Sequence, residues 1–345
     1  MIKRRKTRVV KVGGVPIGGG NPVVVQSMLK TKTSDIERAA AQLRELEKAG
    51  CEIIRVAVKD SDDARAIRKI KEMTGMPLVA DIHFNWKLAL AAIENGADKI
   101  RLNPGNIHKK AQIREVVSSC KRARIPIRVG LNSGSVGGKG SPVTGMVNKC
   151  REYLRILEGM GFYDTVISLK ASNIRDTIDA YSAMASVCDY PFHLGVTATG
   201  LPFQGAIKSS IAIGALLLRG IGDTIRVSLT DEPWEEVKAA FAILESLGLR
   251  SFGPQIISCP TCGRCQVDLV RIVKDFEKAL IDMRRKKPLT VALMGCEVNG
   301  PGEAKHADAG IAFGRGRGML FKKGKAVKRV PVDRCIKVLL NELIN

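Results

Sequence analysis

Hydrophobic and polar positions follow one repeated order between residues 23 and 230. Each unit opens with a short run rich in β-branched residues and passes through a polar or glycine turn. It then continues with apolar residues three and four positions apart, as in Ser34–Gly50, which has a Ser/Asp start and a glycine stop. The eight β-rich runs are Val23–Met28, Glu52–Val58, Pro77–His83, Lys99–Asn103, Pro126–Asn132, Thr165–Lys170, Phe192–Thr197 and Thr224–Leu229. Eight such units predict an α/β fold, a (β/α)8 TIM-like barrel.

The pattern changes after a last helical stretch, Glu232–Leu247. Beyond it, Val267–Arg284 has the spacing of an amphipathic helix and Thr290–Gly295 that of a buried strand. A hairpin and a final helix near Pro331–Ile344 follow. The sequence therefore predicts two domains, a barrel over residues 1–250 and a small α/β domain over residues 251–345.

Polar residues lie within the β-rich runs or at their carboxyl ends. Asp81 and His83 are two positions apart, so both point to the same side of their strand. The catalytic groups of barrel enzymes gather at the carboxyl ends of the strands. The polar residues are Arg55, Asp81, His83, Arg101, Asn103, Arg128, Asn132, Lys170, Thr197, Arg226 and Ser228. Only Asp81 among them is acidic, which makes salt bridges to barrel carboxylates a weak explanation for the cations. We therefore expect a cationic barrel mouth that binds a multiply charged anion such as a diphosphate.

The composition agrees with an anionic ligand. The net charge is +22, which calls for an anionic partner or substrate. Because the basic residues are dispersed, aromatic residues are only 4%, and no RNA-recognition motif, helix-turn-helix or C₂H₂ pattern is present, we do not expect nucleic acid to be that partner. No apolar run approaches the ~18 residues that span a bilayer. The basic start lacks the apolar core of a signal peptide. We expect a cytoplasmic protein without membrane contact.

Two glycine-rich segments do not form phosphate-binding motifs. In Ser133–Ser141, Lys139 is followed by Gly140 where a phosphate-binding loop requires Ser or Thr. We interpret this segment as a flexible loop over the barrel mouth. We interpret Gly314–Gly318 as a basic β-turn.

Four cysteines and a glutamate in the second domain have the spacing of a metal or cluster site. Cys259, Cys262 and Cys265 are each separated by two residues, and Cys296 and Glu303 follow around a Gly/Pro turn. The first three match the bacterial ferredoxin run, whose fourth cysteine is missing here. A second Cys-x-x-Cys, usual in zinc ribbons, is also missing. An iron–sulfur cluster with one replaceable iron, an all-cysteine electron-transfer cluster and a structural zinc therefore all remain open.

The other five cysteines have apolar, periodic surroundings. An odd total of nine argues against a disulfide framework. We interpret them as small buried hydrophobic residues. They are Cys51, Cys120, Cys150, Cys188 and Cys335.

Several longer motifs occur together over nearly the whole chain. They are Val12–Gly18, Val25–Met28, Ala80–Asn85, Arg101–Asn106, Ile207–Ser210, Gly222–Ser228, Cys259–Arg264, Met294–Cys296 and Asn299–Glu303. Together they closely resemble the bacterial 4-hydroxy-3-methylbut-2-enyl diphosphate synthase family of the methylerythritol phosphate route to isoprenoids.

The resemblance implies a cofactor and a reaction. The cofactor is a [4Fe-4S] cluster held by Cys259, Cys262, Cys296 and a catalytic Glu303, with Cys265 as an extra thiol. The reaction is the reductive ring opening of 2-C-methyl-D-erythritol 2,4-cyclodiphosphate, with loss of water, to (E)-4-hydroxy-3-methylbut-2-enyl diphosphate. Electrons arrive singly from reduced flavodoxin or ferredoxin. The resemblance also implies a homodimer in which the cluster domain of one chain closes the barrel of the other.

The resemblance further assigns the polar strand residues. Asp81 and His83 lie beside the bound substrate as candidate catalytic groups. Substrate-binding positions are Arg55, Arg101, Asn103, Arg128, Asn132, Lys170, Thr197, Arg226 and Ser228. One position departs from the family, which commonly reads Gly-Val-Thr-Glu-Ala-Gly where this chain has Ala198 within Gly195–Gly200. Alanine cannot transfer a proton and the neighbouring Thr199 is a poor acid, so another residue or a water has to serve.

The residues alone also support a different class of protein. A phosphate- or nucleic-acid-binding barrel with a structural zinc domain would be colourless and would contain zinc. An electron-transfer module with four cysteine ligands beside an aldolase-like barrel would depend on Cys265 more than on Glu303. Metal content and the two corresponding variants separate these alternatives.

Overall fold

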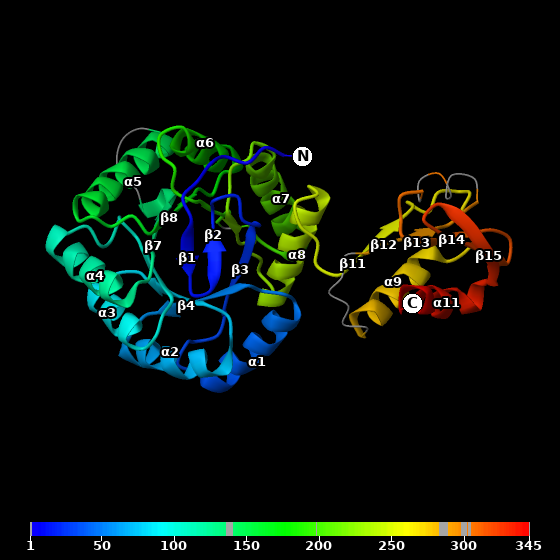
Figure 1. The fold of residues 1–345 in the computed structure, drawn as a ribbon, viewed down its shortest axis with the longest axis horizontal. Helices are drawn as coiled ribbons and strands as arrows, with labels where there is room; N and C mark the ends of the chain where they lie inside the picture. The colour runs from blue at the N-terminus through cyan, green and yellow to red at the C-terminus, as the bar shows by residue number, and fades with distance from the viewer. Residues whose placement is uncertain are drawn as a thin grey trace. The chain divides into compact units, whose positions relative to one another are not determined.

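The chain forms two compact units, Met1–Arg250 and Ser251–Asn345, each with its own hydrophobic core. In the computed structural model of the chain, residues 2–135, 141–197, 199–282, 289–297, 302 and 305–344 are described. Figure 1 shows a ring of helices around strands in the first unit and a sheet with helices in the second.

The first unit is a nearly closed eight-stranded parallel barrel, as predicted. Its strands are β3 (Val24–Met28), β4 (Ile53–Val58), β5 (Leu78–Ile82), β6 (Lys99–Leu102), β7 (Ile127–Asn132), β8 (Thr165–Lys170), β9 (His193–Leu194) and β10 (Thr224–Ile225). They are ordered β8-β7-β6-β5-β4-β3-β10-β9, and a bridge between Ile167 and Phe192 brings β8 to β9. The surrounding helices are α1 (Ile36–Lys48), α2 (Ser61–Met73), α3 (Trp86–Glu94), α4 (Lys110–Ala123), α5 (Pro142–Gly159), α6 (Ile174–Ala185), α7 (Pro202–Leu218) and α8 (Pro233–Ser246).

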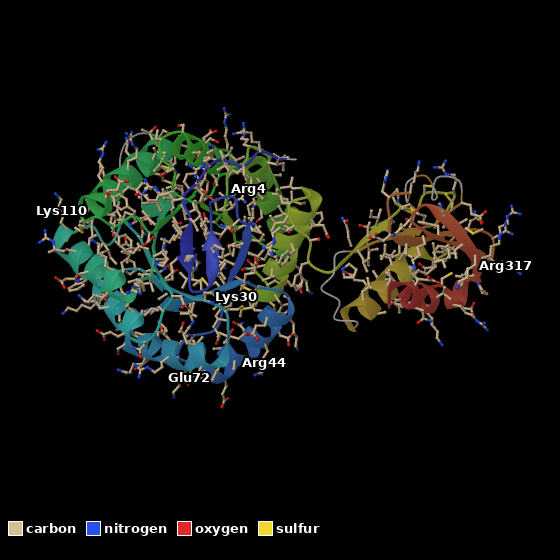
Figure 2. The ribbon with its side chains drawn as sticks, viewed as in Figure 1. Arg4, Lys30, Arg44, Glu72, Lys110 and Arg317 are labelled. Atoms are coloured by element: carbon tan, nitrogen blue, oxygen red, sulfur yellow. The ribbon has the colours of Figure 1, made fainter. Side chains whose placement is uncertain are left out.

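The alternation of side chains along each strand separates the core from the barrel interior. In β4, Ile54, Val56 and Val58 belong to the core under the helices, so Arg55 between them faces inward. The outer surface of the helices is charged: Arg44, Glu72 and Lys110 are exposed and project from them (Figure 2). The helix α1 begins as its sequence predicts, because the side chain of Asp35 accepts a hydrogen bond from the Arg38 N–H at 3.2 Å.

A hairpin closes the amino-terminal end of the barrel. Strands β1 (Val10–Val12) and β2 (Val15–Ile17) pair in antiparallel fashion. Val12 and Ile17 pack against one inward-facing residue from each of three barrel strands, namely Val24, Ile53 and Val79. This apolar layer is the floor of the barrel. The site must therefore lie on the carboxyl side of it.

Strands β9 and β10 are shorter than the predicted runs Phe192–Thr197 and Thr224–Leu229. The Arg226 N–H still donates to the Leu194 carbonyl at 3.0 Å, but the Leu229 N–H donates instead to the carboxylate of Glu236 at 3.0 Å. A side chain thus replaces a strand as the hydrogen-bond partner of Leu229, beyond the end of the ladder.

The second unit is a mixed five-stranded sheet with two main helices. Its strands are β11 (Pro254–Ser258), β12 (Leu289–Met294), β13 (Ala309–Phe313), β14 (Arg317–Lys322) and β15 (Lys325–Pro331), paired in that order. The predicted helices are confirmed as α9 (Leu269–Asp282) and α11 (Cys335–Ile344). Strand β11 was not predicted from the sequence, and it runs parallel to β12. Of the helices in the described part of the chain, none is long and apolar enough to cross a membrane.

Candidate active site

Asp81 is the first anionic centre of the barrel interior. Its Oδ1 lies 3.2 Å from Arg101 Nη1, and its Oδ2 lies 3.2 Å from His83 Nε2 and 3.7 Å from Arg55 Nε. Burial opposes ionisation, but the charges of Arg55 and Arg101 and the His83 contact outweigh it and hold the pKa of Asp81 well below its usual range. The predicted pair Asp81 and His83 is thus brought together, and the carboxylate stays ionised.

The two arginines around Asp81 are fixed by further contacts. Arg101 Nη2 donates to the Gly130 carbonyl at 3.0 Å, and a Cβ at Gly130 would lie 2.6 Å from Arg101 Nε. Glycine at this position therefore leaves the space that the guanidinium group fills. The Arg55 Nη2 group lies 2.8 Å from the sulfur of Met28. Burial lowers the pKa of Arg55 to about 10.

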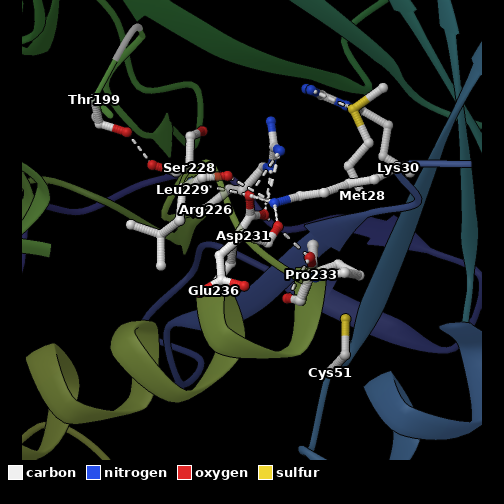
Figure 3. A network of polar contacts seen from close by, with 12 residues as sticks. Met28, Lys30, Cys51, Thr199, Arg226, Ser228, Leu229, Asp231, Pro233 and Glu236 are labelled. Atoms are coloured by element: carbon white, nitrogen blue, oxygen red, sulfur yellow. Dashed lines mark hydrogen bonds and ion pairs between the residues drawn. The ribbon is translucent and has the colours of Figure 1, made fainter. Parts of the chain in front are cut away.

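Glu236 on α8 is a second anionic centre, which sequence reasoning missed (Figure 3). Its carboxylate accepts hydrogen bonds from Nε and Nη2 of Arg226, both at 3.3 Å, and lies 3.0 Å from Lys30 Nζ. Glu236 is 1% exposed. We expected salt bridges to barrel carboxylates to be a weak explanation for the predicted cations. That expectation is wrong, because three of the five predicted cations (Arg55, Arg101 and Arg226) pair with a carboxylate. The only signal for Glu236 was an acidic residue in the first turn of an otherwise apolar helix face.

Arg128 and Lys170 differ from these three cations. Among the described residues, neither lies within 4.0 Å of a carboxylate oxygen. Burial, together with the surrounding cations, holds the pKa of each well below its usual range. A Cβ at Gly195 would lie 2.7 Å from Lys170 Nζ, so the ammonium group approaches the backbone that follows β9. Of the five predicted cations, these two are the ones that no described carboxylate pairs.

The uncharged candidates follow the ends of their strands. Asn103 is buried after β6, and its Oδ1 accepts from the Gly105 N–H at 3.0 Å; Asn132 ends β7. Thr197 and Ser228 lie in the segments that follow β9 and β10, and both are partly buried. The Thr199 hydroxyl donates to the Ser228 carbonyl, so it is already engaged. Ala198, the departure from the family, and the loop residues 136–140 lie outside the described residues.

In the second unit the cysteines collect at the carboxyl ends of β11 and β12. Cys259 follows β11 and Cys296 comes two residues after β12; Ser258 pairs with Leu293, which places the two ends side by side. The Gly295 N–H donates to Cys259 Sγ at 3.2 Å. A Cβ at Gly295 would collide with Cys265 Sγ and lie 3.4 Å from Cys259 Sγ, so both sulfurs gather over this glycine.

These thiols fit an iron–sulfur cluster in their chemistry. Thiolates are the usual cluster ligands, and backbone N–H donors to sulfur stabilise them. Cys262 is exposed, and its backbone contact with Arg264 lowers its pKa. Within the described ranges no three His, Cys, Asp or Glu side chains converge as at a preformed metal-ion site. Glu303 lies outside the described residues.

The remaining cysteines are structural. Cys51, Cys120, Cys150 and Cys335 are buried as predicted, whereas Cys188 is only partly buried. Burial raises the pKa of Cys51 to about 12 and that of Cys335 to about 11. These thiols are therefore unreactive at neutral pH.

Comparisons with known proteins cover both units. A family model described as the GcpE TIM-barrel domain matches residues 7–241, and one described as the GcpE protein C-terminal domain matches residues 255–345. A 4-hydroxy-3-methylbut-2-en-1-yl diphosphate synthase (flavodoxin) of Thermodesulfovibrio yellowstonii is 51% identical, with 99% of each chain covered. One of the same name from Caldanaerobacter subterraneus subsp. tengcongensis is 50% identical over 99% of this chain and 98% of its own.

Solved structures are similar in fold alone. The N-acetylneuraminic acid synthetase of Leptospira borgpetersenii serovar Hardjo-bovis superposes with a TM-score of 0.53 at 12% identity, covering 80% of this chain and 98% of its own. The dihydropteroate synthase of Xanthomonas albilineans gives 0.51 at 14% identity, covering 70% and 97%. At these identities the likeness extends to the barrel and not to its chemistry.

Proposed function

Because the chain belongs to the GcpE family and is an oxidoreductase of that family, we propose that it reductively opens 2-C-methyl-D-erythritol 2,4-cyclodiphosphate. The product is (E)-4-hydroxy-3-methylbut-2-enyl diphosphate. The step takes up two electrons and two protons, with both diphosphates counted as free acids, and releases one water. The observation that carries the proposal is the full-length identity of about half to relatives named for making this product.

The proposed cofactor is a [4Fe-4S] cluster. Cys259, Cys262 and Cys296 would hold it, with Glu303 as the fourth ligand. An oxygen ligand exchanges more readily than a thiolate, so the iron bound by Glu303 would keep an exchangeable coordination position. When bound, the cluster supplies electrons one at a time to the substrate. The thiols over Gly295 and its N–H donor support this ligand set.

The barrel would bind the two phosphates of the substrate. Arg128 and Lys170 lack carboxylate partners in the described part of the chain, so no described carboxylate competes with an incoming anion for them. Arg55, Arg101 and Arg226 are held by Asp81 and Glu236 and present orientated N–H donors. Asn103, Asn132, Thr197 and Ser228 add neutral donors. When the ring opens, negative charge grows on a phosphate oxygen, and these cations stabilise it.

Asp81 and His83 are the proposed proton-transfer pair. The Asp81 carboxylate accepts from His83 Nε2 and fixes the orientation of the ring. His83 is half exposed, at 49%, so its other ring nitrogen can reach substrate or water.

The electron donor would be reduced flavodoxin, the protein in the names of the relatives, or ferredoxin. The net charge of +22 supports docking of an acidic electron carrier.

We also propose that the protein works as a cytoplasmic homodimer. An apolar stripe on α7 supports the pairing, since Phe203, Ile207 and Ile211 recur four residues apart and are 75%, 45% and 52% exposed. The double variant Phe203→Glu/Ile207→Glu should then sediment as a monomer.

Anaerobic metal analysis combined with turnover tests the proposal. About four irons per chain, with turnover lost in Glu303→Ala and retained in Cys265→Ala, would support it. Stoichiometric zinc without iron or turnover would overturn it and leave a basic barrel with a structural zinc domain. Activity lost in Cys265→Ala but kept in Glu303→Ala would indicate an electron-transfer cluster with four cysteine ligands.

A further inference from the structure

A second group of polar side chains lies inside the barrel, between the Asp81 centre and the apolar floor. Lys99 begins β6 and His193 begins β9, whereas Arg101 and Gly195 lie two residues further on toward the carboxyl ends. Gln26 faces inward because its neighbours Val25 and Ser27 face the helices. We call Gln26, Lys99, Arg128 and His193 the inner polar layer. Only Arg128 among them belongs to the proposed substrate site.

The inner polar layer is buried and lacks partners. Lys99 Nζ, Arg128 Nε and Nη1, His193 Nε2 and both amide atoms of Gln26 have no hydrogen-bond partner in the described part of the chain. Each of the four side chains is at most 1% exposed. A buried polar group without a partner costs about 1–3 kcal/mol, so native proteins rarely leave several together. A bound ion or small molecule is therefore needed as the hydrogen-bond partner of these groups.

The charges in this layer have one sign. Asp81 and Glu236 already pair with Arg55, Arg101 and Arg226, and no described carboxylate lies within 4.0 Å of Lys99 or Arg128. The groups also interact with one another: burial, and then the charge of Arg128, hold the pKa of Lys99 well below its usual range. Burial lowers the pKa of His193, and Arg128, Lys170 and Lys99 lower it further. Water would satisfy the hydrogen bonds but not the charge.

The ring of His193 is set up as a donor. Its Nδ1 lies 2.8 Å from the Thr224 hydroxyl, which can donate to it. With Nδ1 accepting, the neutral ring carries its proton on Nε2, the buried atom without a partner. The layer thus offers a lysine amine, a guanidinium and an imidazole N–H as donors, and an anion bound beside Lys99 would favour its protonated form.

We propose that the inner polar layer binds one small inorganic anion of halide size, held by Lys99, Arg128 and His193. This anion would neutralise part of the cationic interior while no substrate is present. It lies below the proposed diphosphate site and is separated from solvent by the floor of Val12, Ile17 and Val24. The inference does not depend on which reaction the barrel catalyses.

Anomalous diffraction from substrate-free crystals grown in sodium bromide tests the site directly. Wild type, Lys99→Met and the exposed control Lys87→Met are compared. Lys99→Met keeps the length of the side chain and removes an unpaired buried charge, a change that proteins commonly tolerate. We expect a bromide peak within hydrogen-bond distance of Lys99 Nζ and the Arg128 guanidinium in wild type and Lys87→Met, and no peak in Lys99→Met.

A solution measurement gives the second test. Both tryptophans, Trp86 and Trp234, belong to the barrel unit, so tryptophan fluorescence reports barrel unfolding. Replacing sodium gluconate by sodium chloride at equal ionic strength should raise the Tm of wild type and Lys87→Met by about 2 °C, and leave that of Lys99→Met unchanged.

Two results would overturn the proposal. Identical density in chloride and bromide crystals, fitted by waters, would show that the layer is hydrated. Bromide confined to Arg55 and Arg101 at the Asp81 centre would be an adventitious ion only, attached to the substrate site. Neither result would affect the proposed reaction, which is tested by iron content and turnover.

Discussion

The barrel unit and the second unit prepare their candidate sites in different ways. In the barrel, Asp81 and Glu236 hold three arginines at hydrogen-bond and ion-pair distances, and the strands that carry them are fixed by a continuous core. In the second unit the cysteines share two strand ends, yet within the described residues no three ligand side chains converge. Folding alone therefore pairs the charges of the barrel interior, whereas the proposed cluster draws its cysteine ligands from the ends of two strands and a further ligand from Glu303, outside the described residues. Metal-binding free energy is then part of the stability of the second unit only.

The largest expected effect separates the two units completely. Cys259→Ser should remove the cluster, lower iron from about four per chain to near zero and reduce turnover by at least about 10³-fold. Barrel unfolding, followed by the fluorescence of Trp86 and Trp234, should stay unchanged. Cys265→Ser is the matched control, because its sulfur lies over the same Gly295 but it is not a proposed ligand. Equal iron loss in both variants would contradict the proposed ligand set.

The next effect tests how far the barrel depends on Asp81. Asp81→Asn leaves Arg55 and Arg101 buried without a carboxylate. We therefore expect the free energy of barrel unfolding to fall by about 3–5 kcal/mol, measured by urea denaturation with tryptophan fluorescence. Asp62→Asn removes one partner of an exposed ion pair on α2 and should change the free energy of barrel unfolding by less than about 1 kcal/mol. A stable Asp81→Asn barrel would show that the Asp81 centre does not hold the interior together.

The pH dependence follows from the depressed pKa of Asp81. The unfolded carboxyl titrates near its ordinary value of about 3.9. Since the folded pKa lies well below that, the stabilisation is fully present above about pH 4 and is lost as the pH falls through the folded value. Barrel stability in wild type should fall more steeply below pH 4 than in Asp81→Asn. Parallel curves of stability against pH for wild type and Asp81→Asn would rule out a contribution from the ionisation of Asp81.

A smaller effect divides the cations within the barrel. Lys170→Met should weaken binding of the cyclic diphosphate about 10- to 100-fold, because a charge-assisted contact is lost, and should not destabilise the barrel. Arg101→Met should both weaken binding and lower the unfolding free energy, since Asp81 loses a partner at 3.2 Å. Calorimetric titration and urea denaturation of the two variants measure the difference. If Lys170→Met destabilises as much as Arg101→Met, the distinction between free and paired cations is wrong.

The smallest effect concerns packing. Gly130→Ala would place a Cβ 2.6 Å from Arg101 Nε, and we expect a cost of about 1–2 kcal/mol in barrel stability with a few-fold weaker substrate binding. Gly134→Ala is the control, since nothing lies within 4 Å of the added Cβ. Equal behaviour of the two alanine variants would show that Arg101 moves aside without cost.

Much of the barrel could be predicted because its signals are local. Period-two alternation in β4 and β5 places Arg55 and Asp81 on the inner side, and the Ser/Asp start and glycine stop delimit α1. The second unit was predicted less completely. Strand β11 has partly buried and exposed residues but no fully buried one, and it directly precedes the cysteines, so its five residues gave no strong apolar pattern.

The sequence by itself determined the order of the elements, the inward-facing polar residues, the cysteine spacing and, through motifs over the whole chain, the family. Only the tertiary structure decided which groups meet: that Arg226 pairs with Glu236 from α8, that Lys99 Nζ and His193 Nε2 have no partner among the described residues, and that a hairpin forms the floor. The physical reason is that alternation and capping act between near neighbours in the chain. Ion pairing and burial depend on distances across the barrel, which arise only once the strands are arranged around it.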